Sequence, residues 1–270
     1  MAENDTTYYE KDEPPRVLQS QDMENFDGGS SSATSFSMKT FTWLVLLVQV
    51  FGLAAVVMVA VWMGHFRGGF AWQSNPGLEF NYHPLFMIIG MVFLFGDAIL
   101  AYRVFRNDNK LIIKIVHACM QAGALIFAAV GLKAVFDSHN LPADPIPNLY
   151  SLHSWLGIIT VVMFGLQWVF GFVSYLYPKV GMASRRMYMP YHVFWGIAIL
   201  CFAVATALMG ITEKVIFSKI SYSSFIPEGV LLNCLGLTIV AFVTLVVFLV
   251  TRPEFKRPPG PEEEHLQLAE

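Results

Sequence analysis

"YSLHSWLGIITVVMFGLQWVFGFVSYLY", residues 150–177, carries a histidine, His153, at the start of an apolar run that meets no charge before Lys179. A helix rises about 1.5 Å per residue, so a run of this length crosses the roughly 30 Å hydrocarbon core of a bilayer. Hydrocarbon cannot satisfy the nitrogens of an imidazole. The sequence therefore predicts a transmembrane helix in which His153 needs a partner inside the protein.

The composition of the whole chain agrees with a membrane protein. Of its 270 residues, 55% are hydrophobic and only 14% are charged, whereas a soluble domain carries about 25% charged residues. Six runs are long enough to cross a bilayer, at residues 41–64, 84–102, 111–136, 152–177, 188–212 and 229–251. We expect an all-α integral membrane protein with six transmembrane helices. Its surroundings are membrane lipid, and we expect no nucleic-acid partner.

The two ends of the chain differ from the apolar middle. Residues 1–38 are polar and contain the Ser- and Gly-rich stretch DGGSSSATS, which is typical of a disordered tail. Residues 39–251 hold the six spans, and residues 252–270 form a second polar tail. An even number of spans puts both termini on one side, and that side collects most of the 17 lysines and arginines. The positive-inside rule then predicts that both termini are cytosolic.

Each of the spans two to five carries one histidine. His83 begins span two in NYHPLFM, and His117 lies in the second turn of span three in KLIIKIVHACM. His153 begins span four, and His192 lies early in span five in RRMYMPYHVFW. Consecutive spans cross the membrane in opposite directions. His83 and His153 are therefore expected in the lumenal half, and His117 and His192 in the cytosolic half.

These matched depths predict two haem sites. In an up-and-down four-helix bundle, sequence neighbours share an edge, and spans two and four, or three and five, face each other diagonally. Two imidazoles that converge at one depth are the axial ligands of a six-coordinate haem. Spans two to five are thus predicted to form a central four-helix bundle with two haems, bound by His83 with His153 and by His117 with His192. The sequence lacks C-x-x-C-H, which excludes covalent c-type attachment through that motif.

Two other functions use the same histidines differently. A proton-coupled or metal-ion transporter would need intramembrane histidines too, but it would cluster carboxylates with them, and the acid in the middle of a span is Asp97. A haem-free scaffold or adhesion protein would use them as helix–helix hydrogen-bonding groups.

Basic residues share a helical face with the cytosolic histidines. Lys110, Lys114 and His117 are spaced i, i+4 and i+7, which places them on one face. Arg185 precedes His192 by seven residues and shares its face if the helix begins that early. Such cations would concentrate an anion near the cytosolic haem. Cations at cytosolic helix ends also orient and anchor spans, so both interpretations stay open.

Several motifs resemble the cytochrome b561 family of transmembrane di-haem proteins: FRGGFAW, FNYHP, AYRVFRN, YSLHSW, EKVIF, PEGVLLN and TRPEFKRP. The resemblance covers all six spans, and the departure from it is Asp97. It implies non-covalent haem b, a homodimer, and an ascorbate-dependent oxidoreductase. Electrons would pass from cytosolic ascorbate to monodehydroascorbate or a ferric chelate on the other face. The membrane would be that of a secretory or endosomal vesicle, or the plasma membrane.

The resemblance also implies roles for residues near both haems. It favours ascorbate binding by basic residues at the cytosolic end, which here are Lys110, Lys114 and Arg185, with Arg103 in support. Three residues lie in loops that flank the lumenal histidines, where they are candidates to contact the acceptor: His139, Tyr150 and Arg67. For each of these three, a solvated loop position is the alternative.

Overall fold

The computed structural model describes residues 20–257, and the side chains from residue 38 onward. The chain divides into two units, Met1–Thr40 and Phe41–Glu270. Helix α1 (Ser20–Val61) begins in the first unit, within the segment predicted as a tail. Residues 1–19 of that segment lie outside the described residues. A helix that is already nucleated in an apolar span can extend at little cost into a polar segment. All further description concerns the second unit.

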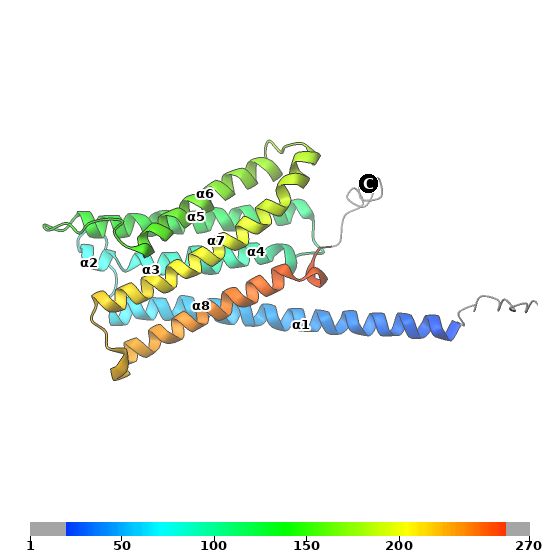
Figure 1. The fold of residues 1–270 in the computed structure, drawn as a ribbon, viewed down its shortest axis with the longest axis horizontal. Helices are drawn as coiled ribbons and strands as arrows, with labels where there is room; N and C mark the ends of the chain where they lie inside the picture. Colours follow the sequence, from blue (N-terminus) through cyan, green and yellow to red (C-terminus); the bar gives the residue numbers. More distant parts are fainter. Residues whose placement is uncertain (1–19, 258–270) are drawn as a thin grey trace, which may run out of the picture. The chain divides into compact units, whose positions relative to one another are not determined.

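Within the described residues, six helical segments are long and apolar enough to cross a membrane, which confirms the predicted spans. They are Met38–Phe66, Pro76–Val104, Lys110–Asn140, Leu152–Tyr175, Met182–Phe217 and Pro227–Thr251. Span one ends in a π-helical turn, η1 (Trp62–Phe66). Span two is divided into α2 (Pro76–Glu79), α3 (Tyr82–Met87), the π-helical η2 (Ile88–Leu94) and α4 (Phe95–Val104). The other spans are α5 (Lys110–Asn140), α6 (Leu152–Tyr175), α7 (Met182–Phe217) and α8 (Pro227–Thr251), shown in Figure 1.

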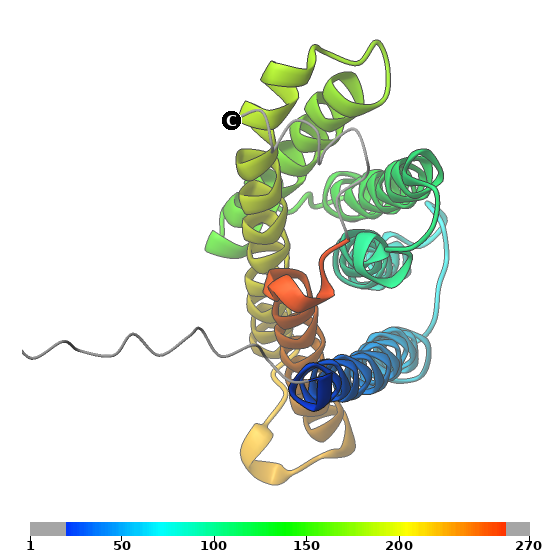
Figure 2. The ribbon, with the colours of Figure 1, turned by 90° about the vertical axis from the view of Figure 1, so that its right-hand side faces the viewer.

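Spans two to five form a four-helix bundle. The elements of span two pack along α5, and α6 packs along α7. The ring closes because α5 also contacts α6 and η2 contacts α7. Seen end-on in Figure 2, spans two and three lie on one side of the bundle and α6 and α7 on the other. Span six, α8, packs against α4 and α7 from outside, and η1 contacts α8. The predicted diagonal arrangement is therefore present.

A capping box sets the position of His153. The Ser151 hydroxyl accepts a hydrogen bond from the backbone N–H of Ser154, and the Ser154 hydroxyl accepts one from the N–H of Ser151. This reciprocal pair satisfies two of the free N–H groups at a helix start. Helix α6 consequently begins at Leu152, and His153 lies in its first turn.

Two further helix starts fix the faces predicted at the other end of the bundle. The side chain of Asn109 accepts a hydrogen bond from Leu111 N at 2.9 Å, so α5 begins at Lys110. Helix α7 begins at Met182, early enough for Arg185 and His192 to share a helical face. The early helix start that the sequence analysis required for Arg185 is therefore present.

Part of the predicted C-terminal tail packs on the bundle. Residues Pro253–Phe255 form a 3₁₀ turn, η4. The ring of Phe255 is buried and lies 4.9 Å from that of Phe41. Arg257 Nη1 donates to the carbonyl oxygen of Asp108 at 2.6 Å. The six-helix domain therefore extends to Arg257, and the rest of the predicted tail lies outside the described residues.

Candidate functional site

The four histidines form the two predicted pairs. The ring centres of His83 and His153 are 6.1 Å apart, and those of His117 and His192 are 6.4 Å apart. A coordinating imidazole nitrogen lies about 2 Å from a metal ion, and its ring centre about 1 Å farther, so two axial imidazoles place their ring centres about 6 Å apart. Both pairs therefore have the separation that a shared iron requires.

Three of the four rings are oriented by a backbone carbonyl on the neighbouring helix. A carbonyl only accepts, so Nδ1 of each ring carries the proton and Nε2 keeps its lone pair for a metal. The hydrogen bonds join His83 Nδ1 to Gly131 O at 3.1 Å, His117 Nδ1 to Ala98 O at 2.7 Å, and His153 Nδ1 to Thr206 O at 2.9 Å. Nitrogen donors held in this way fit haem iron.

His192 is held by packing instead. Its Nδ1 is buried and has no hydrogen-bond partner among the described residues. The rings of Tyr175 and Tyr188 lie 5.4 and 5.7 Å from its ring. On the remaining side the ring rests on Gly171, where an added Cβ would lie 2.8 Å from His192 Cε1. Gln167 Nε2 also donates to the backbone oxygen of His192 at 2.6 Å.

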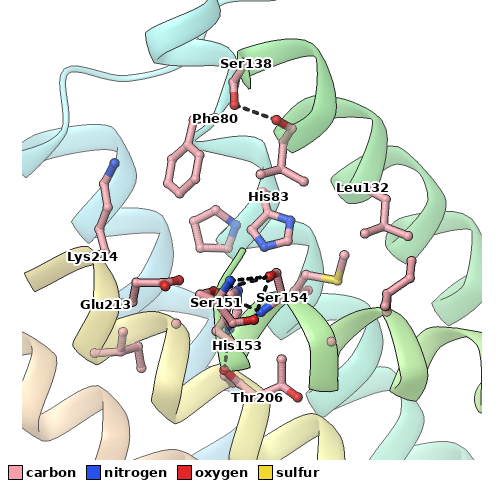
Figure 3. A pocket seen from close by; sticks show the side chains of 18 of the residues that line it. Phe80, His83, Leu132, Ser138, Ser151, His153, Ser154, Thr206, Glu213 and Lys214 are labelled. Atoms are coloured by element: carbon pink, nitrogen blue, oxygen red, sulfur yellow. Dashed lines mark hydrogen bonds between the residues drawn. The ribbon is translucent and has the colours of Figure 1, made fainter. Parts of the chain in front are cut away.

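Each pair borders a cavity. The cavity that His83 and His153 line, which we call the His83 cavity, has a volume of about 500 Å³. Figure 3 shows the two imidazoles in it. The cavity lined by His117 and His192, the His117 cavity, has a volume of about 460 Å³. Both are of the size and mainly apolar character of cofactor sites, which occupy about 300–1,000 Å³.

The predicted basic residues gather at the His117 cavity, with one exception. Lys110, Lys114 and Arg103 line it. Lys114 Nζ donates to the carbonyl oxygen of Tyr175 at 3.3 Å, and Arg103 donates to the carbonyl of Val250. Arg185 is not among the residues that line this cavity, although its charge acts on Lys114. Two cations that the sequence analysis did not single out also line it, Lys256 and Arg257.

At the His83 cavity the structure brings together two of the three predicted residues. His139 and Tyr150 line the cavity, and His139 Nδ1 lies 3.1 Å from Asn148 Oδ1. Arg67 is not among the lining residues and instead forms an ion pair with Glu228. The sequence analysis missed two lining residues near the end of α7, Glu213 and Lys214. Glu213 and Lys214 follow Thr206 by seven and eight residues, so helical spacing places them near its face of α7. This spacing identifies them as cavity residues only once Thr206 is known to contact His153.

Asp97 contacts span one, which lies outside the four-helix bundle. Its carboxylate accepts a hydrogen bond from Gln49 Nε2 of span one at 2.8 Å. Within residues 20–257 it lines neither cavity, and no three His, Cys, Asp or Glu side chains cluster as a metal site would require. The Asp97 carboxylate is therefore hydrogen-bonded between spans one and two and does not join the histidines.

Comparison with known proteins identifies the family. The sequence profile of eukaryotic cytochrome b561 matches residues 82–218, the stretch that contains all four histidines. The chain belongs to the cytochrome b561 family. Among similar cytochromes b561, the transmembrane ascorbate-dependent reductase CYB561 of Ovis aries is 46% identical over 227 residues, which cover 84% of this chain and 88% of the relative. The Homo sapiens protein of that name is 43% identical over 243 residues, which cover 90% and 94%.

A second kind of relative is almost as similar. The plasma membrane ascorbate-dependent reductase CYBRD1 of Mus musculus is 41% identical over 232 residues, which cover 84% of this chain and 79% of the relative. Family membership makes this cytochrome b561 a multi-pass membrane protein with haem b as its cofactor. The imidazole pairs and their cavities fit that cofactor.

Proposed function

We propose that this cytochrome b561 is an ascorbate-dependent oxidoreductase that carries electrons across a membrane through two haems b. His83 with His153 would hold one haem, and His117 with His192 the other. The observation that carries the proposal is the pair of matched imidazole separations, 6.1 and 6.4 Å, in two different cavities. The relatives are named ascorbate-dependent reductases, which supports ascorbate as the donor.

When bound, haem b supplies reversible one-electron chemistry at its iron. The protein contributes the ligands, their orientation and an apolar surrounding. The carbonyls that accept from Nδ1 of three histidines fix the tautomer and raise the basicity of Nε2. The lining of both cavities is mainly apolar.

The donor end would be the His117 cavity. Lys110 and Lys114 lie at this cavity, together with Lys256 and Arg257. Ascorbate is an anion at neutral pH, so these charges would raise its local concentration. There it would lose one electron and one proton to become monodehydroascorbate. The excess of lysine and arginine on this side, which also carries both termini, supports a cytosolic location.

The acceptor end would be the His83 cavity, on the lumenal or extracellular side. His139 and Tyr150 line it and can hydrogen-bond an organic acceptor. Monodehydroascorbate and ferric chelates each need one electron, and we expect a permissive site that reduces both. We further propose a homodimer in a secretory, endosomal or plasma membrane, as the family resemblance implies.

Haem content and its loss in variants test the proposal. The purified protein should contain two haems b per chain by pyridine haemochrome assay, and ascorbate should reduce them. His83→Ala and His153→Ala should remove the same haem, and His117→Ala the other. A folded but colourless preparation, or identical spectral losses in His83→Ala and His117→Ala, would reject the proposal.

A further inference from the structure

Most cations near the His83 cavity are already paired with carboxylates. Arg67 forms its ion pair with Glu228, and Trp62 Nε1 donates to the same carboxylate at 2.8 Å. Lys133 forms an ion pair with Asp137 one turn away on α5. Neither Arg67 nor Lys133 lines the cavity. An incoming anion would therefore find both charges largely neutralised.

Lys214 differs from Arg67 and Lys133 both in its ion pairing and in its position relative to the cavity. Among the described residues, Lys214 is the one lysine or arginine that lines the His83 cavity. No carboxylate in the described part of the chain forms an ion pair with it. Its Nζ lies 3.9 Å from the centre of the Phe80 ring, a cation–π contact. The Phe80 ring lies 6.0 Å from that of His83. Phe80 thus lies between Lys214 and His83, and Figure 3 shows the three side chains around the same cavity.

Glu213 brings the opposite charge to the same cavity. It precedes Lys214 in α7 and lines the cavity with it, and Figure 3 shows the two side chains leaving the helix in different directions. Desolvation, and secondarily the charge of Glu213, raise the pKa of the Tyr150 phenol above its ordinary value. Tyr150 therefore stays protonated at neutral pH and can donate a hydrogen bond.

We propose that Lys214 is the binding residue for an anionic electron acceptor at the His83 cavity, and that Glu213 weakens this binding. Together they set which acceptor charges the protein reduces. The proposal rests on the proposed function, because the electron arrives from the His83 end. The acceptor gains one electron and no bond to the protein forms. A ferric chelate becomes the ferrous chelate, and the monodehydroascorbate anion also takes one proton from water and becomes ascorbate.

Two inorganic acceptors of opposite charge test this selectivity. Proteoliposomes loaded with ascorbate would be mixed with external ferricyanide, an anion, or hexaammineruthenium(III), a cation. Loss of one attracting charge in Lys214→Met should slow ferricyanide reduction about threefold to tenfold at low ionic strength and should speed reduction of the cation. Glu213→Gln should have the opposite effects. High salt should bring the variants and the wild type together, because it screens the charges.

Two further variants act as controls. Lys133→Met removes a cation at the same end of the bundle that does not line the cavity, and it should leave both rates unchanged. Lys214→Arg keeps the positive charge and should keep the ferricyanide rate. A rate loss in Lys214→Met but not in Lys214→Arg would then come from the missing charge and not from misfolding. The proposal is overturned if Lys214→Met leaves the ratio of the two rates unchanged, or if Lys133→Met changes it as much.

The same vesicles separate this proposal from the proposed function. Reduction of the haems by internal ascorbate reports the donor end alone. If ascorbate failed to reduce the wild type, the proposed function would be wrong, and dithionite inside the vesicles would still allow the two acceptor rates to be compared.

Discussion

Substitution of Gly210 by alanine should expel the haem of the His83 cavity. A Cβ at this position of α7 would lie 2.6 Å from Cε1 of His153 and 3.0 Å from its Nδ1. Ordinary carbon contacts are about 3.5–4.0 Å, so the ring would have to move by about 1 Å. It cannot do so freely, because its Nδ1 is bonded to the carbonyl of Thr206, one turn earlier on the same helix.

The size of the effect follows from these two contacts. Overpacking and a weakened hydrogen bond together cost about 2–4 kcal/mol, which corresponds to about a 30- to 1,000-fold loss of affinity for haem. A pyridine haemochrome assay on Gly210→Ala should therefore give close to one haem per chain, and a redox titration should show the His117–His192 haem alone. Gly165→Ala on α6 is the control, because its Cβ would meet Leu125 Cδ1 at an ordinary 4.0 Å and Gly165 lines neither cavity. Full haem content and an unchanged titration in Gly210→Ala would show that His153 does not depend on this close contact.

Four other substitutions test three separate parts of the structure. Lys114→Ala should slow reduction by ascorbate severalfold at low salt while haem content is kept, and Arg185→Ala should slow it less. If stopped-flow rates do not change in either variant, both residues serve only to orient and anchor their spans. Ser151→Ala removes the cap of α6 and should cost about 1 kcal/mol, seen as a lower unfolding temperature and earlier release of the His83-cavity haem on heating. Glu228→Gln leaves Arg67 without its counter-charge and should destabilise the protein by about 1–3 kcal/mol; a thermal melt identical to that of the wild type would contradict this.

The spans and the histidine pairs could be predicted because both depend on position along a helix. Apolar length alone identifies a span, and the direction of each span gives the depth of its histidine. His83 and His153 therefore had to share a level, as did His117 and His192. The face shared by Lys110 and Lys114 was equally predictable, since it follows from helical spacing once α5 begins at Lys110.

What could not be predicted depends on the rotation of helices and on distant contacts. Local sequence does not reveal that Arg67 forms an ion pair with Glu228 at the start of span six, and its role at the acceptor site stays a prediction. Lys214 was not singled out from the sequence, because its place in the cavity depends on how α7 is rotated. The start of α1 at Ser20 was missed because composition describes the preference of an isolated segment, whereas here the segment extends an existing helix.

The carbonyl bonds of the ligand histidines have a consequence for biogenesis. His83 and His117 bond across spans two and three, and His153 bonds across spans four and five. Each hairpin can therefore orient its own rings as soon as its two helices have inserted and paired. Each proposed iron site, however, takes one ligand from each hairpin. During synthesis the rings of the first hairpin would thus be set before the second hairpin is complete. The proposed His83 site would receive its second ligand with span four, and the proposed His117 site only with span five.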